Sequence, residues 1–387
     1  MKKLIALLLC VVCLAQSAFA ASPAESARDL ALSAVSGQKL LAGVSGELLA
    51  GVSGELLAQG EDFPAGTSVC DWTAIAFALL GAEDGAAYLA AENEYISANF
   101  PLPASGRAPV ATDWQRAALT VRALGGDPTA CGTDGSVDLI AGGVYDYAGD
   151  SLGMQGLNGW IFALIALDCG GYEVPKGSRY TREDILNEIL SAQEPDGGFG
   201  LVSGASDTDI TAMAVQALAP YADGEAASAV DAALAWLAAQ MTEECLFAYW
   251  GQPSAESSAQ VVIALCSLGI DPAEDERFAK NGTNALEALC NTYRRADGSY
   301  AHTPEDERGD FMATEQVMLA FTALWKLRSG AGRLYDMTAV PQTAVETAPE
   351  KAPAGTPWLT VILCLAAAAV TVVVIVVMCR KKKEKRA

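Results

Sequence analysis

Histidine is nearly absent from this sequence. Among 387 residues there is one, His302. Zinc sites built from imidazoles need several histidines, and a Ser-His-Asp hydrolase needs one histidine held beside its serine. The sequence therefore argues against both a His-rich metal site and a hydrolase of that type.

Basic side chains are also few. The chain carries 25 Lys and Arg against 47 Asp and Glu, a formal net charge of −22. Residues 21–356 alone hold 46 acidic and 17 basic side chains, which gives −29. Such a surface repels a phosphate backbone, so nucleic acid is excluded as a partner.

Aromatic residues make up 7% of the chain and charged residues 19%, whereas hydrophobic residues reach 51%. A chain this apolar can bury a large core, and it is not a disordered polyelectrolyte. The abundance of alanine and glycine beside few aromatics indicates closely packed helices.

The N-terminal end has the three regions of a secretory signal peptide. Residues 1–20 begin with two lysines, continue with an apolar run and end in Ala18-Phe19-Ala20. We therefore expect cleavage after Ala20. Residues 21–59 follow as an N-terminal helical segment that contains a tandem duplication of LLAGVSGE.

The C-terminal end predicts a membrane anchor. Residues 358–379 are continuously apolar, long enough as a helix to cross a hydrocarbon core of about 30 Å. A basic tail, residues 380–387, comes next, and positive residues stay in the cytoplasm. We expect a single-pass type I protein of the cell membrane with the large acidic part outside, joined to its helix by a Pro/Ala/Thr-rich stalk at 331–357.

Six cysteines remain in the exported part: Cys70, Cys131, Cys169, Cys245, Cys266 and Cys290. An even number outside the cell permits disulfides, and six cysteines allow fifteen pairings. Cys266 and Cys290 lie within apolar helical runs, so buried free thiols and bridges both stay open. No pair shows a close metal-type spacing, and we expect no metal and no cofactor.

Internal repetition is the most informative feature. Six apolar runs of roughly ten residues begin at Asp71, Asp113, Asn158, Asp209, Glu256 and Met312. The starts are separated by 42, 45, 51, 47 and 56 residues. Because Asp and Asn are good N-caps, we expect those at four of these starts to cap helices.

One-sided helical patterns lie between the apolar runs, and residues 23–59 supply the first partner. The other patterns cover 86–98, 181–193, 226–240 and 283–294, with a weaker one at 136–145. Alternation of an apolar helix with an amphipathic one is typical of two nested layers. The fold expected for 60–330 is all-α, an α6/α6 toroid in which six inner helices are enclosed by six outer ones.

Two turns before inner helices share a motif, Gln193-Glu-Pro-Asp-Gly-Gly-Phe199 and Ala296-Asp-Gly-Ser-Tyr300. Gln-x-x-Asp-Gly-x-Phe resembles the Q-W repeat of the terpenoid cyclase and protein prenyltransferase superfamily, whose fold is the α6/α6 toroid. With the segments 152–164 and 206–221, residues 60–330 are similar to surface-exported bacterial members and, more distantly, to transcobalamin-type carriers. The resemblance is specific for fold and weak for activity.

Zinc-dependent prenyl transfer is disfavoured within that superfamily. The last inner helix reads Asp310-Phe-Met-Ala313-Thr where prenyltransferases typically have Asp-Phe-Tyr-His-Thr, so Ala313 takes the position of the zinc histidine. The preceding inner helix also lacks the family's Asp-x-Cys pair. We therefore expect neither zinc nor transfer of a prenyl group.

Cyclase chemistry has one pair of candidate residues. Class II terpene cyclases protonate an alkene with the middle Asp of a DxDD motif, and this chain offers Asp207-Thr208-Asp209-Ile210. By this resemblance Asp209 is the proton donor and Asp207 its neighbour, although Ile210 replaces the last acid. The competing interpretation is that Asp209 is only an N-cap.

Acids and indoles recur near the starts of the inner helices and define a candidate binding rim. The rim consists of Asp71, Trp72, Asp113, Trp114, Asn158, Trp160 and Glu256. We expect a non-catalytic module that binds an amphipathic small molecule, of cobalamin type or another, or a surface partner. The alternative functions are a cyclase-like enzyme using Asp209 and an adhesion module with an acidic face.

Overall fold

The computed structural model describes residues 64–81, 85–100, 109–296 and 298–342. The expected signal peptide, the duplicated segment at 21–59, the expected transmembrane helix at 358–379 and the basic tail lie outside these residues. Within the described part of the chain, no helix is both long enough and apolar enough to span a bilayer.

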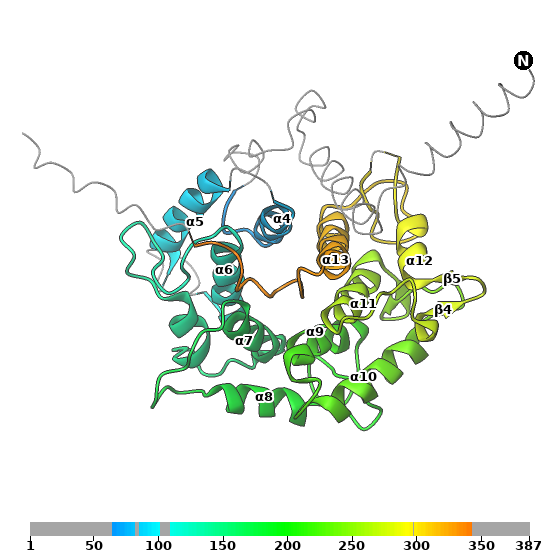
Figure 1. Ribbon diagram of the computed structural model, residues 1–387, viewed down its shortest axis with the longest axis horizontal. Helices are drawn as coiled ribbons and strands as arrows, with labels where there is room; N and C mark the ends of the chain where they lie inside the picture. Colours follow the sequence, from blue (N-terminus) through cyan, green and yellow to red (C-terminus); the bar gives the residue numbers. More distant parts are fainter. Residues whose placement is uncertain (1–63, 82–84, 101–108, 297, 343–387) are drawn as a thin grey trace, which may run out of the picture. The chain divides into compact units, whose positions relative to one another are not determined.

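The prediction of a mainly helical domain is confirmed. Six helices, which we call inner, each begin within three residues of an expected start. They are α4 (Ser68–Leu79), α6 (Ala111–Ala123), α7 (Asn158–Cys169), α9 (Thr208–Leu218), α11 (Ala255–Ser267) and α13 (Phe311–Ser329). Each packs against the next in this order, and α13 packs against α4 (Figure 1).

Four further helices lie outside the inner ones. These are α5 (Ala86–Asn99), α8 (Arg182–Ser191), α10 (Ala227–Gln240) and α12 (Ala285–Thr292). They contact α6, α7, α9 and α11 respectively. The weak pattern at 136–145 yields only a π-helical turn, η2 (Ala141–Tyr145), where Gly142 and Gly143 lie against Trp114 too closely to accept a side chain.

Regular structure between the helices is short. Two-residue hairpins pair β2 (Ala248–Tyr249) with β3 (Gln252–Pro253) and β4 (Ala279–Lys280) with β5 (Thr283–Asn284), both antiparallel. β1 (Met154–Leu157) leads into α7, and the 3-10 turns are η3 (Ala219–Tyr221) and η4 (Glu276–Phe278).

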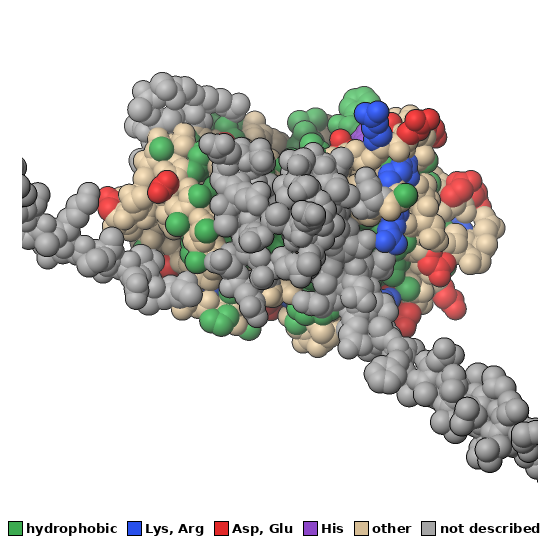
Figure 2. Space-filling model, turned by 90° about the horizontal axis from the view of Figure 1, so that it is seen from above, with side chains coloured by type: hydrophobic (Ala, Val, Ile, Leu, Met, Phe, Trp, Pro, Cys, Tyr) green, Lys and Arg blue, Asp and Glu red, His purple; other side chains and the backbone are tan. Residues whose placement is uncertain are grey.

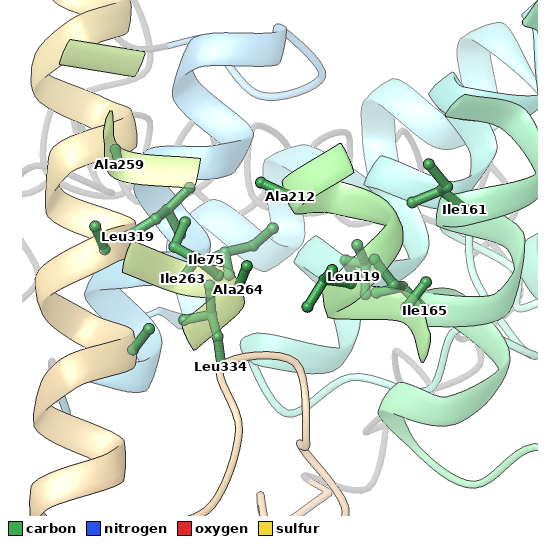
Figure 3. Close-up of a cluster of buried hydrophobic side chains, with 14 of the residues drawn as sticks. Ile75, Leu119, Ile161, Ile165, Ala212, Ala259, Ile263, Ala264, Leu319 and Leu334 are labelled. Atoms are coloured by element: carbon green, nitrogen blue, oxygen red, sulfur yellow. The ribbon is translucent and has the colours of Figure 1, made fainter. Parts of the chain in front are cut away.

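The core lies where the inner helices meet (Figure 3). Isoleucine and leucine side chains from several inner helices are fully buried there, including Ile75, Ile161, Ile263 and Leu319. Ala212 and other fully buried alanines lie between them. Small residues let neighbouring helices approach closely, which explains how a core with few aromatics reaches a high packing density.

A seven-residue turn recurs before three helices. Single antiparallel bridges join Gln193 to Phe199 and Arg294 to Tyr300, the two turns with the shared motif, and also Cys131 to Val137. The third turn reads Cys-Gly-Thr-Asp-Gly-Ser-Val and was not expected from the sequence. In each turn the glycine after the aspartate position has a left-handed φ, between +70° and +94°, which glycine adopts at least cost.

The expected caps are wrong at Asp71, Asp113 and Asp209. These helices begin one to three residues earlier than expected, so the acids lie within the first turn. The observed side-chain caps of inner helices are other residues. Asp207 accepts from Ile210 N (3.0 Å), Ser254 from Ser257 N (3.1 Å) and Asp310 from Ala313 N (2.9 Å). Asn158 is the first residue of α7 and makes no cap either.

The described part of the expected stalk belongs to the helical unit. After α13 the chain runs back across the inner helices toward α6 (Figure 1), with Leu334 and Met337 fully buried. Arg122 Nη2 donates to the carbonyls of Met337 (2.6 Å) and Val340 (2.8 Å). The packed segment thus extends to about residue 340, and the boundary placed at 331 is corrected accordingly.

Candidate functional site

A cavity of about 440 Å³ lies among the N-terminal halves of the six inner helices. All six contribute to its wall, together with β1, the loop before α9 and the segment after α13. The lining residues are Ser68, Trp72, Thr112, Arg116, Gln155, Asn158, Phe162, Leu201, Met213, Gln260, Glu315, Gln316, Leu319 and Tyr335.

Helix position explains which residues line the wall. Counted from the first residue of each helix, the lining residues include the fifth position of α4, α7 and α13, which are Trp72, Phe162 and Glu315. The sixth residue of four helices also lines the cavity. These residues are Arg116 in α6, Met213 in α9, Gln260 in α11 and Gln316 in α13. A helix turns about 100° per residue, so the fifth and sixth positions can both face the cavity, whereas a side chain two positions earlier points about 200° away.

The three tryptophans predicted for the rim therefore have different locations. Trp72 lines the cavity, as does Asn158. Trp114 is the fourth residue of α6 and packs edge-on against Phe100, with ring centroids 4.6 Å apart, beside a separate pocket. Trp160 is the third residue of α7 and packs against Tyr180 at 5.3 Å. Neither of the last two reaches the cavity.

Three aromatic rings come together on the cavity wall. The Trp72 ring lies 5.6 Å from that of Phe162 and 6.3 Å from that of Tyr335, between centroids. Tyr335 comes from the segment after α13, which the sequence analysis assigned to the stalk. Phe162 was also missed, although it occupies the same helical position as Trp72.

Glu315 is the buried acid of the cavity. Its residue is 1% exposed, and its Oε1 has no hydrogen-bond partner within the described structure. Burial raises the pKa of this carboxyl well above its usual range, and the negative charges of Glu256, Asp310 and Asp71 raise it further while Arg116 opposes them. A buried carboxylate is stable only when it is paired, and the Glu315 carboxyl lacks such a partner among the described residues.

Arg116 is already paired. Its Nε lies 2.9 Å from Asp71 Oδ2, its Nη1 lies 3.2 Å from Asp113 Oδ1, and its Nη2 donates to the carbonyl of Gly66 at 3.1 Å. Asp71 is fully buried and accepts two more hydrogen bonds, from Gly66 N and Tyr88 Oη. Asp71 and Asp113 thus hold Arg116 in place and are not among the lining residues.

Asp207 and Asp209 have different environments. Asp207 caps α9, whereas Asp209 lies one helical turn before the lining residue Met213 and is not itself a lining residue. Oδ1 of Asp209 is buried and has no hydrogen-bond partner among the residues that the structure describes. Burial raises the pKa of Asp209 to about 6, a shift that Asp207 and Glu256 increase and a hydrogen bond from Ser257 reduces.

Glu256 lies near Asp209 and is paired with the single histidine. Both of its carboxylate oxygens are 2.9 Å from Nδ1 of His302, which is half-exposed in the loop before α13. This pair raises the pKa of His302 above its ordinary value even though burial acts in the opposite direction. The histidine is therefore a partner of a first-turn acid of α11, a role that its place in the sequence did not reveal.

Among the described residues no group of three His, Cys, Asp or Glu side chains is placed to hold a metal ion. Ala313, at the expected zinc-histidine position, is fully buried. All six cysteines named above are free thiols in the structure.

No known family model matches this chain. No curated protein matches it significantly either.

Proposed function

We propose that residues 64–342 form an α/α toroid of the terpenoid cyclase and prenyltransferase type. The order of contacts among the six inner helices supports this, because the last helix packs against the first. The four outer helices, each against an inner one, and the Gln-x-x-Asp-Gly-x-Phe turn at 193–199 agree with it.

The function we propose for this toroid is non-catalytic binding of an amphipathic small molecule in the central cavity. The observation that carries it is the combination of a 440 Å³ cavity, an aromatic wall and a buried carboxyl without a partner. The volume lies within the range of about 300–1,000 Å³ that is typical of small-molecule pockets. Six apolar or aromatic side chains and eight polar ones share the wall, which suits an amphipathic ligand. A ligand of this volume is smaller than a cobalamin.

The surroundings of this site are part of the proposal. We propose that the domain lies outside the cell on a single-pass type I anchor, which the signal peptide, transmembrane helix and basic tail expected from the sequence support. Protease added to intact cells would then release a soluble helical fragment by cutting after residue 342.

Native mass spectrometry of protein purified from its source tests the binding function. We expect a retained small molecule, and we expect its readdition to the stripped protein to quench tryptophan fluorescence. Trp72→Phe should remove most of the quenching, whereas Trp160→Phe, a matched change outside the cavity, should keep it. Equal loss in the two variants would contradict binding in the cavity.

A cyclase-like enzyme is the second candidate, and the observation that favours it is Asp209. A buried carboxyl with a pKa of about 6 retains its proton on part of the molecules near neutral pH, as a proton donor requires. The test is incubation with a linear polyprene. Cyclised product that disappears in Asp209→Asn would establish this function, and absence of product from the unmodified protein would reject it.

A further inference from the structure

We infer that the cavity selects a ligand with a positively charged ammonium end, held beside Glu315 and against the rings of Trp72, Phe162 and Tyr335. The inference rests on the proposed binding function and specifies the ligand class. The apolar body of such a ligand would lie along the remaining aliphatic wall, which includes Met213 and Leu319.

Glu315 is the acid of the wall whose buried oxygen has no partner among the described residues, whereas several other polar side chains there are paired. Asn158 Oδ1 also lacks a partner, but it is a neutral acceptor and carries no charge. Gln260 Nε2 donates to Gln316 Oε1 at 2.7 Å, and Gln155 Oε1 accepts from Thr112 Oγ1 at 2.6 Å. Arg116 forms ion pairs with Asp71 and Asp113. The buried Oε1 of Glu315 is left without a donor. A cation in the cavity would provide the missing opposite charge, and an uncharged apolar ligand would not.

The aromatic rings of the cavity wall also favour a cationic ligand. The rings of Phe162 on α7 and Tyr335 in the segment after α13 lie 5.6 Å and 6.3 Å from the ring of Trp72 on α4, between centroids. The face of an aromatic ring attracts a cation, and several rings around one ammonium group form the usual recognition site for quaternary amines. An acid beside three rings therefore matches an alkylammonium better than it matches an anion or a neutral polar group.

The charges around Glu315 act in the same direction. The acids that act on it are Glu256 of α11, Asp310 at the start of α13 and Asp71 of α4. Cys70 of α4 and Tyr335 of the following segment also interact with it, and both are neutral because burial raises their pKa values. Arg116 of α6 is the cation among these neighbours, and its ion pairs with Asp71 and Asp113 offset its charge. The remaining negative charge near Glu315 is that of Asp310 and of Glu256, which His302 partly offsets. Acidic side chains outnumber basic ones over residues 21–356, and Figure 2 shows several of them at one edge of the described surface, beside Lys and Arg side chains. A net negative field concentrates cations near the protein.

Exposed apolar side chains lie at the same end of the helices as the cavity. In the described structure the exposed large hydrophobic residues are Met154, Leu201, Val202, Tyr249, Trp250 and Met312. They lie in the loops that lead into α7, α9 and α11 or in the first turn of α13. Such residues offer contacts to the apolar part of an amphipathic cation that extends beyond the cavity.

The test uses three probes that share a six-carbon chain and differ in the charge of the head: hexyltrimethylammonium, hexan-1-ol and hexanoate. Isothermal titration calorimetry on the purified full-length protein should give an affinity for the cation at least about tenfold above that for the alcohol, equivalent to about 1.4 kcal/mol. Hexanoate should bind weakest. Glu315→Gln should remove the preference for the cation, and Glu188→Gln, an exposed acid on α8, should leave it unchanged.

Proton release provides a second measurement. A cation binds the ionised form of Glu315, whose pKa is raised, so binding should release protons. Titrations in two buffers of different ionisation enthalpy should detect this release in the unmodified protein and lose it in Glu315→Gln. Should that variant not fold, Trp72→Leu should weaken binding of the cation more than that of the alcohol.

The outcomes separate this inference from the function on which it rests. If the cation and the alcohol bind equally and both quench Trp72, the binding function stands and the inference is wrong. If none of the probes binds and native mass spectrometry finds no ligand, the proposed function itself fails. A cation preference that survives in Glu315→Gln would also overturn the inference.

Discussion

Asp207 and Asp209 are two residues apart, yet they affect the domain in opposite ways. Asp207 satisfies a backbone N–H at the start of α9, whereas Asp209 buries an oxygen that has no partner. We expect Asp207→Ala to lower the free energy of unfolding by about 0.5–2 kcal/mol, the usual cost of losing an N-cap. Chemical denaturation monitored by circular dichroism measures this. Asp207→Asn, which keeps the capping oxygen, is the control and should be nearly silent.

The pH dependence of stability tests the environment of Asp209. Its pKa rises from an ordinary 3.8 to about 6 in the folded protein. The folded state thus holds the proton more tightly, so Asp209 lowers stability progressively as the pH rises from about 4 to about 6. One pKa unit corresponds to about 1.4 kcal/mol, which makes the full effect about 3 kcal/mol.

Asp209→Asn removes the ionisation and should therefore be more stable than the unmodified protein above pH 6, by up to this amount. The two proteins should converge toward pH 4. Denaturant midpoints measured at pH 4 and pH 7 give the comparison. A stability difference that does not change with pH would show that Asp209 has an ordinary pKa.

At the scale of helices, apolar periodicity was sufficient to predict where the inner helices lie but not where each begins. Expected and observed starts differ by up to three residues, from Asp71 to Ser68 in α4. An apolar run indicates that a helix is buried. The first residue of that helix depends instead on backbone φ and ψ and on the cap. Thr67 precedes α4 in an extended conformation and makes no side-chain capping hydrogen bond. The sequence therefore gives no signal for the start of this helix.

These small differences had a large effect on the predicted site. Counted from the expected starts, the three indoles lay close to equivalent positions, but the true starts place them at the third, fourth and fifth positions of their helices. Trp72 alone then lines the cavity. Glu315 and Tyr335 were missed because nothing local distinguishes them; their environment arises from contacts between segments far apart in the chain.

The segment after α13 contributes to the core and to the cavity wall. Truncation of the chain before this segment tests its contribution. A chain that ends at residue 330 loses Leu334, Met337 and Tyr335, which are two buried side chains and one wall of the cavity. It also leaves Arg122 and Lys326 without the carbonyls they bind. Loss of buried Leu or Met alone costs about 2–5 kcal/mol per residue.

We therefore expect truncation after residue 330 to lower the melting temperature strongly and to abolish ligand binding. The matched control is truncation after residue 342, which retains these contacts and should change neither. Differential scanning calorimetry compares the two proteins. Equal melting temperatures would show that the segment does not stabilise the domain.

For the whole molecule, the contact between α13 and α4 decides how the domain unfolds. An open array of helix pairs contacts only neighbours along the chain, so its ends open without the middle. In the proposed toroid no inner helix is an end, because the first and last support each other. Local damage at this contact should therefore weaken distant helices as well.

Ile75→Ala tests the closure. Ile75 of α4 is fully buried, and its truncation should cost about 2–5 kcal/mol. Ile189→Ala on the outer helix α8 is the chemically matched control, since Ile189 is equally buried. Hydrogen exchange read by mass spectrometry should show faster exchange in α7 and α9 as well as in α4 for Ile75→Ala, because global unfolding becomes easier throughout. Exchange that rises only in α4 and α13 would mean that the helices open as an array and that closure does not couple them.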